Sequence, residues 1–215
     1  MFVDNKEAIG DEDIMFINHS NVNKLVIYNI IKRIIDILGS FCGIIVFSPI
    51  FIITAILIKI ESKGDIIFKQ IRIGKDSKPF YIYKFRSMKI DAPNIATNDL
   101  QDPDFYITKV GKFTRKTSID ELPQLFNILK GDMSIVGPRP VIEKEHDLLQ
   151  LRRDNYVDRI MPGITGWAQI NGRDNLEVEE KVRYDKEYLY KRSLGFDSYI
   201  MVMTILKVLK RSDIK

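Results

Sequence analysis

The chain has 215 residues, enough for one domain and too few for two well-formed ones. Its residues are 45% hydrophobic and 29% charged, which excludes an intrinsically disordered chain. A net charge of +4 favours an anionic partner, and the single cysteine, Cys42, excludes an internal disulfide and a cysteine-based zinc site.

The first sixty residues change from a polar to an apolar composition. Residues 1–23 are polar and show no sustained periodicity, so we expect a loosely ordered tail. Residues 24–36 predict a helix that continues into a stretch of 22 residues, Ile37–Ile58, without a charged side chain. A straight helix of that length reaches roughly 33 Å, close to the hydrocarbon core of a bilayer. The stretch starts too deep in the chain for a signal peptide.

Two features of the apolar stretch argue against a simple membrane span. Pro49 cannot donate to the carbonyl of Ile45, so the helix should kink there, and the Ser48 hydroxyl could meet the freed backbone groups. Basic residues lie on both flanks, whereas they normally mark the cytoplasmic side alone. A hairpin that enters and leaves by one face satisfies both features. A kinked spanning helix and a buried helix of a soluble protein remain alternatives.

The middle of the chain predicts short elements. Residues 66–68 and 80–83 predict two strands joined by a turn at Gly74–Asp76, and residues 91–103 predict a loop. Residues 117–130 predict a helix that ends at Gly131. One apolar face of this helix is formed by Leu122, Leu125, Phe126 and Leu129.

The last third of the chain predicts further helices. Residues 141–160 predict a charged helical stretch, and residues 162–167 a turn-rich loop. Helices over residues 178–190 and 197–211 follow. The last helix carries a stripe that could meet lipid or pack on the core, formed by Met201, Ile205 and Leu209.

Two adjacent carboxylates, Asp120 and Glu121, open the helix predicted over residues 117–130. Ser118 followed three residues later by Glu121 is a capping box, so the pair has an ordinary interpretation as a helix start. The same carboxylates could hold Mg²⁺, and a carboxylate can attack phosphorus to form an acyl phosphate. Basic residues suited to phosphate groups cluster around the pair, namely Lys84, Arg86, Arg115, Lys116 and Arg139. This clustering makes catalysis plausible.

Four motifs surround this cluster, and in chain order they are Lys84–Met88, Thr117–Leu125, Gly131–Pro140 and Pro162–Trp167. Together they resemble the bacterial sugar transferase family, the monotopic phosphoglycosyl transferases, and the likeness runs from Lys32 to the C-terminus. The chain resembles the short form with a catalytic domain alone, since no bundle of spanning helices precedes it. One departure is Phe126, an aromatic exchange where the family usually has tryptophan.

The resemblance implies an α+β, membrane-associated fold. Its parts are a re-entrant N-terminal helix broken at Ser48–Pro49, amphipathic interfacial helices, and a small β-hairpin around a helical catalytic core. The chain is then divided into a polar tail (1–23), a re-entrant membrane helix (24–60) and a catalytic domain (61–215). The expected location is the bacterial inner membrane, with a monotopic topology and the active site facing the cytoplasm.

The resemblance also implies the reaction. Asp120 is the nucleophile and a ligand of Mg²⁺, and Glu121 assists beside the metal. A UDP-sugar is attacked at its β-phosphate, UMP leaves, and polyprenyl (undecaprenyl) phosphate takes the sugar phosphate from the aspartyl intermediate. This is the first membrane step in building a glycoconjugate such as a capsule or O-antigen.

By position in the motifs, two groups of residues are expected to bind substrate. The expected phosphate contacts are Lys84, Arg86, Arg115 and Arg139. The expected lining of the nucleotide-sugar pocket is Gln169, Asn171 and Arg173. The sugar, the glycan pathway and the oligomeric state, including a homodimer, stay open.

Three other functions compete with this interpretation. A membrane-tethered scaffold for anionic lipids would need no acidic pair inside a basic cluster. A nucleic-acid-binding protein is disfavoured by the apolar stretch, so we expect no nucleic-acid partner. An ordinary lipid glycosyltransferase would release UDP instead of UMP.

Overall fold

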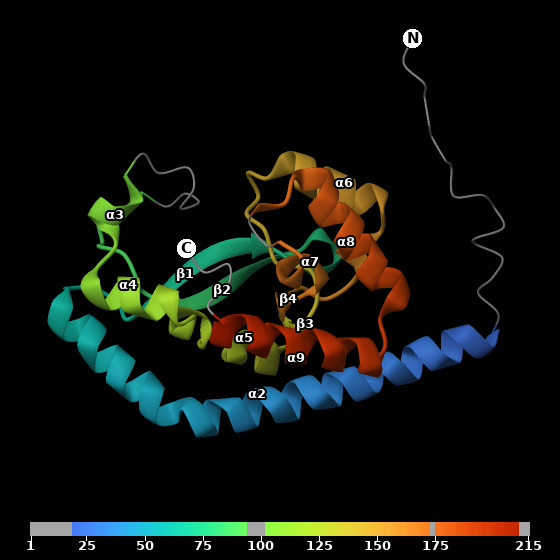
Figure 1. Cartoon of the computed structure of the whole chain (residues 1–215), viewed down its shortest axis with the longest axis horizontal. Coiled ribbons are helices and arrows are strands. Elements are labelled where there is room, and N and C mark those ends of the chain that lie inside the picture. The colour runs from blue at the N-terminus through green and yellow to red at the C-terminus, as the bar shows by residue number, and fades with distance from the viewer. Residues whose placement is uncertain (1–18, 94–101, 173–174, 211–215) are drawn as a thin grey trace, which may run out of the picture.

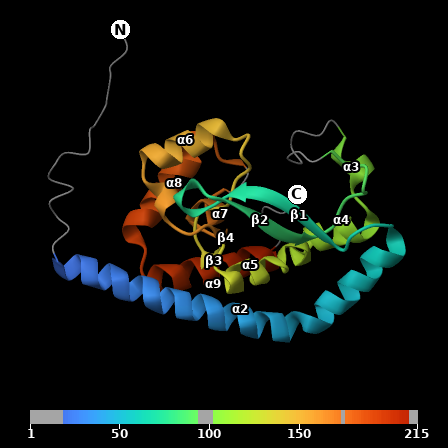
Figure 2. The same cartoon turned by 180° about the vertical axis from the view of Figure 1, so that it is seen from behind.

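The computed structural model describes residues 19–93, 102–172 and 175–210. Its longest element is helix α2, His19–Glu61, which bends in its middle (Figure 1). The rest of the protein lies on the concave side of this arc, as the view from behind also shows (Figure 2). The predicted continuity of residues 24–36 with the apolar stretch is confirmed, and the helix begins earlier, at His19, inside the segment expected to be a tail.

Pro49 lies inside α2 and leaves the carbonyl oxygen of Ile45 without its helical donor. The Ser48 hydroxyl donates to that oxygen at 2.7 Å, so the predicted use of Ser48 at the break is confirmed. A bend is the expected consequence of a proline within a helix. The result is one bent helix whose two arms form an open arc (Figure 1).

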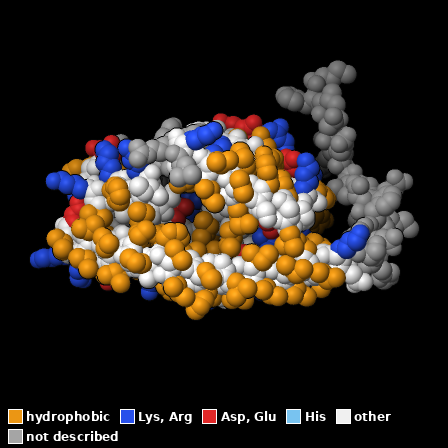
Figure 3. Space-filling model, turned by 60° about the horizontal axis from the view of Figure 1, so that its bottom comes forward, with side chains coloured by type: hydrophobic (Ala, Val, Ile, Leu, Met, Phe, Trp, Pro, Cys, Tyr) orange, Lys and Arg blue, Asp and Glu red, His pale blue; other side chains and the backbone are white. Residues whose placement is uncertain are grey.

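Most side chains of α2 are exposed, and many of them are large and apolar. Figure 3 shows these hydrophobic side chains gathered along the long helix. The part from Asn23 to Glu61 is long and apolar enough to cross a membrane, by length and composition. Its exposure argues against the buried helix of a soluble core, which would turn these side chains inward.

The predicted β-hairpin is present and longer than expected. Strand β1, Ile67–Ile73, pairs antiparallel with β2, Pro79–Phe85, and the turn between them contains the short 3₁₀ helix η1, Lys75–Ser77. Ile82 of β2 is buried with Ile128 and Met133 in a core cluster. The hairpin therefore packs on the segment that follows the acidic pair.

The helix predicted over residues 117–130 is divided in the structure. After α3, Pro103–Tyr106, the elements are α4, Lys109–Lys116, η3, Ile119–Glu121, and α5, Gln124–Lys130. Thr117 ends α4, and Ser118 adopts a left-handed conformation that interrupts the helix. The end at Gly131 is confirmed, with φ 101°.

The apolar side of α5 faces α2. The rings of Phe126 and Phe51 lie 5.8 Å apart, edge to face. Gly43 of α2 lies so close to Leu125 that an added Cβ would come within 3.2 Å of its side chain. Leu125 and Phe126, from the predicted apolar face, thus pack on α2.

A second, parallel sheet has no counterpart in the elements predicted from the sequence. Strand β3, Ser134–Val136, pairs with β4, Gly163–Thr165, which lies in the expected turn-rich loop. Gly137 allows the close approach, because a Cβ there would lie 2.2 Å from the carbonyl oxygen of Met161. Of the stretch predicted helical over residues 141–160, the structure has α6, His146–Asp154, and η4, Val157–Arg159.

The two C-terminal helices predicted over residues 178–190 and 197–211 are confirmed, whereas the short helix that precedes them was not predicted. After α7, Trp167–Ile170, come α8, Val178–Lys191, and α9, Leu194–Lys210. Met201 packs against the core cluster around Ile200, whereas Ile205 is exposed. Of the predicted stripe, Met201 therefore packs on the core and Ile205 does not, while the side chain of Leu209 lies outside the described residues.

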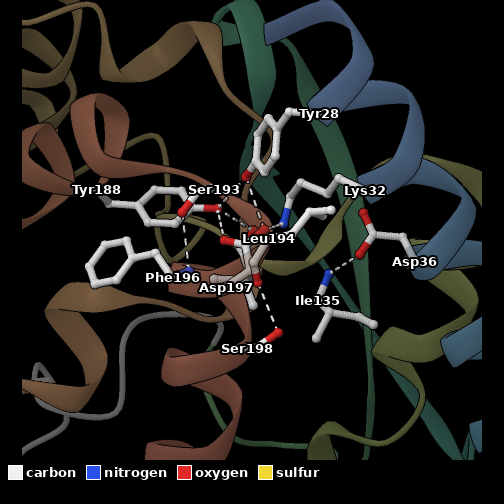
Figure 4. Close-up of polar contacts among 11 residues, drawn as sticks. Tyr28, Lys32, Asp36, Ile135, Tyr188, Ser193, Leu194, Phe196, Asp197 and Ser198 are labelled. Carbon is white, nitrogen blue, oxygen red and sulfur yellow. Dashed lines mark hydrogen bonds and ion pairs between the residues drawn. The ribbon is translucent and has the colours of Figure 1, made fainter. Parts of the chain in front are cut away.

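Polar side chains on the first half of α2 bind it to the C-terminal region (Figure 4). The buried carboxylate of Asp197 in α9 accepts hydrogen bonds from Tyr28 (2.9 Å) and Lys32 (2.8 Å) of α2. Asp36, also buried, accepts from the backbone N–H of Ile135 at 2.9 Å. These charged groups therefore turn toward the protein rather than toward the apolar surface.

Both arms of α2 are attached to the same body. In the first arm, Arg33 donates to the carbonyls of Ile128 (2.7 Å) and Leu129 (3.0 Å) in the last turn of α5. At the other end, Glu61 accepts hydrogen bonds from the backbone N–H groups of Lys109 and Val110, the first residues of α4. The arc is thus anchored on each side of Pro49.

Candidate active site

The acidic pair lies in η3, between α4 and α5. Asp120 is buried, with 9% of its surface exposed. The capping box predicted for Ser118 is wrong: its φ is 56° and its side chain makes no cap hydrogen bond. A left-handed backbone is strained for a residue other than glycine, by about 1–2 kcal/mol. This strained turn sets the two carboxylates ahead of α5 instead of inside one helix.

Glu121 joins two of the predicted phosphate contacts. Its Oε1 atom lies 2.9 Å from Nζ of Lys84, which comes from β2. The same oxygen lies 3.1 Å from Nη2 of Arg139, which comes from the loop after β3. Residues distant in sequence are therefore brought together by charge-assisted hydrogen bonds at one carboxylate.

Asp120 has an environment distinct from that of Glu121. Burial, followed by the negative charge of Glu121, raises the pKa of Asp120 from 3.8 to about 6. The positive charges of Lys84, Arg115 and Arg139 oppose this increase. The predicted contact Arg115, at the end of α4, thus also belongs to the electrostatics of the site. At neutral pH the carboxylate predominates, as a poorly solvated anion among cations.

Arg86 occupies a different place from the other predicted phosphate contacts. Its guanidinium donates to the carbonyl of Lys63 and to the carbonyl and hydroxyl oxygens of Ser62, each at 2.8 Å. It passes so close to Gly64 that a Cβ there would lie 2.3 Å from Nη1. In the structure Arg86 therefore binds the end of α2, and it makes no hydrogen bond to the acidic pair.

The expected pocket residues lie near β4 and α7. Gln169 donates to the carbonyl of Ile164, and Asn171 to that of Trp167, each at 2.8 Å. Neither amide makes a hydrogen bond to Asp120 or Glu121. The Oε1 atom of Gln169 is buried and accepts no hydrogen bond from the described residues. Arg173 lies outside those residues.

Arg72 is a site residue that the sequence analysis missed. It lies on β1, and its Nη2 donates to Oε1 of Gln70 at 2.7 Å. Burial, followed by the positive charge of Arg139, lowers the pKa of Arg72 to about 10, while Glu145 and Glu121 oppose this. An arginine between two isoleucines was the available signal, but the predicted strand ended before it. Arg72 adds a further cation to the region around Glu121.

The donor set bears on the predicted Mg²⁺. In the part of the chain that the structure describes, no group of three or more His, Cys, Asp or Glu side chains could hold a metal ion. Mg²⁺ does not need such a cage, because it is commonly bound by one or two carboxylates together with substrate phosphates and water. Asp120 and Glu121 fit that kind of site, in which the substrate completes the coordination.

Comparisons with known proteins agree on one family. The chain matches the family model described as bacterial sugar transferase over residues 27–211. It is 43% identical over 188 residues to the UDP-N-acetylgalactosamine-undecaprenyl-phosphate N-acetylgalactosaminephosphotransferase of Aeromonas hydrophila, a match that covers 85% of this chain and 44% of that protein. It is 41% identical over 195 residues to the UDP-glucose:undecaprenyl-phosphate glucose-1-phosphate transferase of Escherichia coli (strain K12), covering 87% and 41% respectively.

A shorter relative is covered almost completely. The uncharacterized sugar transferase EpsL of Bacillus subtilis (strain 168) is 40% identical over 188 residues, which is 86% of this chain and 91% of that protein. The chain thus spans less than half the length of the first two relatives and most of the third. With the family model matched over most of its length, the chain belongs to the bacterial sugar transferase family.

Proposed function

We propose that this protein is an enzyme that transfers a sugar phosphate from a UDP-sugar to polyprenyl phosphate and releases UMP. The names of its relatives specify UDP-sugars and undecaprenyl phosphate as their substrates. In this chain, the observation that carries the proposal is the buried Asp120 beside Glu121, which is ion-paired to Lys84 and Arg139. A scaffold protein would have no need for such a costly buried carboxylate.

In the first half-reaction, a carboxylate oxygen of Asp120 attacks the β-phosphorus of the UDP-sugar. A phosphorus–oxygen bond to Asp120 forms and the bond to the bridging oxygen breaks, so that UMP leaves with that oxygen and the electron pair. Asp120 suits this role better than Glu121, because two cations withdraw charge from the Glu121 carboxylate. Its burial leaves the carboxylate less solvated, so less hydration has to be removed before it attacks a bound phosphate.

In the second half-reaction, a phosphate oxygen of the polyprenyl phosphate attacks the same phosphorus. The bond to Asp120 breaks, the carboxylate is restored, and polyprenyl diphosphate-sugar leaves. The overall exchange needs no further reactant, since one phosphorus–oxygen bond replaces another in each step. Two half-reactions through one covalent intermediate give ping-pong kinetics.

The cations around the pair are placed to bind the two phosphates. Lys84, Arg115 and Arg139 act on the charge of Asp120, and Arg72 lies within the field of Arg139 and Glu121. With Glu145, whose Oε1 lies 4.0 Å from Nη1 of Arg72, the four cations face three carboxylates, and the remaining positive charge favours a polyanionic substrate. Mg²⁺ would be held by Asp120 with Glu121 beside it and would offset the charge on the leaving phosphate.

We also propose that α2 enters and leaves the membrane on the same face. Hydrogen bonds tie its first arm to α5, β3 and α9, and its far end to α4. Two arms attached to one body cannot emerge on opposite sides of a bilayer without drawing that body into it. The arm after Pro49 also reaches only roughly 20 Å, less than the hydrocarbon core of about 30 Å.

This topology would place both substrates within reach of Asp120. The apolar convex side of α2 would lie in one leaflet, and the body on its concave side would lie at the membrane surface (Figures 1 and 3). A soluble nucleotide sugar and the head group of a lipid phosphate meet at such an interface. We place the reaction at the cytoplasmic face of the inner membrane, as the first membrane step of a glycoconjugate pathway.

The test is analysis of the released nucleotide. The purified full chain, in detergent with Mg²⁺ and polyprenyl phosphate, is incubated with a panel of UDP-sugars. We expect UMP, and we expect Asp120→Asn to abolish its release. Without the lipid acceptor, the intact mass of the protein should increase by one sugar phosphate in the wild type only. Release of UDP would instead identify a glycosyltransferase. If Asp120→Asn released UMP at the normal rate, Asp120 would be excluded as the nucleophile.

A further inference from the structure

The loop that carries Arg139 is held at three consecutive carbonyl groups. The Pro138 oxygen accepts from the backbone N–H of Gly163 in β4 at 2.9 Å. The Arg139 oxygen accepts from Nη1 of Arg152 at 2.8 Å, and the Pro140 oxygen accepts a longer bond, 3.5 Å, from Nη1 of Arg72. The prolines on each side of Arg139 further restrict the backbone. Pro138 and Pro140 are buried, where an unpaired carbonyl would be costly, so these three bonds also fix the backbone on each side of Arg139.

Arg152 is itself fixed by a buried partner. It lies on α6, and its Nε and Nη2 atoms donate to Oδ2 of Asp185 on α8, at 3.0 Å and 2.6 Å. Both residues are buried, with 8% and 1% of their surface exposed. The guanidinium therefore uses two of its nitrogens on Asp185 and directs the third at the backbone of Arg139.

A buried ion pair is a weak source of stability, because the loss of hydration offsets much of the attraction between the charges. Replacement of such pairs by apolar residues of similar volume is often neutral or stabilising. Stability alone therefore does not account for Asp185 and Arg152. Their arrangement at the carbonyl of Arg139 offers a second role.

We infer that Arg152, oriented by Asp185, is a positioning residue that sets the place of Arg139 in the active site. From its fixed backbone, Arg139 reaches Glu121 with Nη2 at 3.1 Å. This connects α8 and α6 to the acidic pair in a chain of contacts: Asp185, Arg152, Arg139 and Glu121. The inference rests on the proposed function, in which Arg139 contacts a substrate phosphate.

Arg152→Lys separates positioning from folding. A lysine keeps the positive charge beside Asp185, so the buried carboxylate retains a partner. It lacks the planar fork that lets one side chain serve Asp185 and the Arg139 carbonyl together. We expect kcat/KM for UMP release to fall by about 10- to 100-fold, the cost of a catalytic group displaced by a fraction of an ångström or more.

A double-mutant cycle with Arg139→Ala isolates the effect. Alanine at position 139 keeps the carbonyl that Arg152 binds and removes only the side chain that Arg152 is inferred to position. We therefore expect Arg152→Lys to cost little further activity in the Arg139→Ala background. Arg33→Lys is the matched control, since Arg33 also donates to backbone carbonyls but in α5. Its effect on activity should be the same in both backgrounds.

The outcomes distinguish the two proposals. A wild-type protein that releases no UMP from any UDP-sugar would contradict the proposed function. An active wild type in which Arg152→Lys loses the same factor with and without the Arg139 side chain would overturn the positioning role alone. Melting temperatures of all variants are measured, and should Arg152→Lys fail to fold, Asp185→Asn is taken through the same cycle with the same expectation.

Discussion

The ammonium group of Lys84 lies 2.9 Å from the carboxylate of Glu121, so a strand of the β-hairpin is joined to the turn that carries the acidic pair. The pairing gives the two adjacent carboxylates different characters. Glu121 is neutralised by cations, whereas Asp120 is buried and has a raised pKa. This difference agrees with the two proposed roles, Asp120 as the nucleophile and Glu121 beside the metal, and each role can be tested.

Glu121→Gln should shift the pH dependence of the reaction. The charge of Glu121 raises the pKa of Asp120, while Lys84 and Arg139 lower it. Removing that charge, and with it the ion pairs to both cations, should bring the pKa of Asp120 below about 6. We expect a lower kcat/KM and an acid limb displaced to lower pH, measured as UMP release from about pH 5 to about pH 8.

The control for this profile is Glu187→Gln, which removes a carboxylate that is ion-paired to Lys191 on α8. Its acid limb should stay where the wild type has it. An acid limb that Glu121→Gln leaves unmoved would mean that Asp120 is not the group whose ionisation controls the rate.

Asp120→Asn should stabilise the fold at neutral pH while abolishing activity. The folded-state pKa of about 6 lies above the ordinary 3.8, so the folded protein holds this proton more tightly than the unfolded chain. Ionisation of Asp120 therefore opposes folding. Its free-energy cost grows as the pH rises from 3.8 to about 6 and reaches its full size above about pH 6. Asparagine carries no charge and removes this cost. We expect a higher melting temperature near pH 7.5 without metal or substrate, and a smaller gain near pH 4.5.

Asp102→Asn provides the comparison for that measurement, because Asp102 is exposed. Its melting temperature should follow that of the wild type at both pH values. A gain for Asp120→Asn that is equal at both pH values would show that packing, not charge, is responsible.

How much of this site follows from the sequence depends on whether the relevant contacts are local. The long helix α2 and the β-hairpin of β1 and β2 each arise from a continuous stretch of sequence, and both were predicted. The turn at Ser118 was not predicted, because the spacing of Ser118 and Glu121 matches a capping box although the backbone of Ser118 is left-handed and its side chain makes no cap hydrogen bond. Arg152 and Asp185 lie on different helices and meet only through the tertiary fold, and the pairing of β3 with β4 has the same origin. A motif identifies the family to which a chain belongs, but the direction of the Arg86 side chain depends on its neighbours in the fold, here Ser62 and Lys63.

Arg86→Lys separates a role at the end of α2 from a role at the phosphates. The guanidinium makes three hydrogen bonds to Ser62 and Lys63, which a lysine cannot reproduce together. Loss of two of them, at about 1 kcal/mol each, should lower the melting temperature by several degrees. We expect KM for the UDP-sugar to change little.

Lys84→Met is the counterpart of Arg86→Lys, with the opposite balance expected. It should raise KM or lower kcat strongly and affect the melting temperature less, since Lys84 is partly exposed beside Glu121. A large rise in KM for Arg86→Lys at an unchanged melting temperature would restore the phosphate contact expected from the sequence.

The topology of α2 can be tested with single cysteines on its two arms. In a Cys42→Ser background, Asn23→Cys and Asp65→Cys place one thiol ahead of the apolar stretch and one beyond it. Because both arms are attached to the same body, we expect a membrane-impermeant maleimide to modify both positions from the cytoplasmic side alone. In inside-out vesicles the maleimide should label both thiols. In right-side-out vesicles it should label neither thiol until the vesicles are permeabilised. Modification of the two thiols from opposite sides would require a full span, and the hydrogen bonds of Arg33 and Glu61 to one body would then have to break in the membrane.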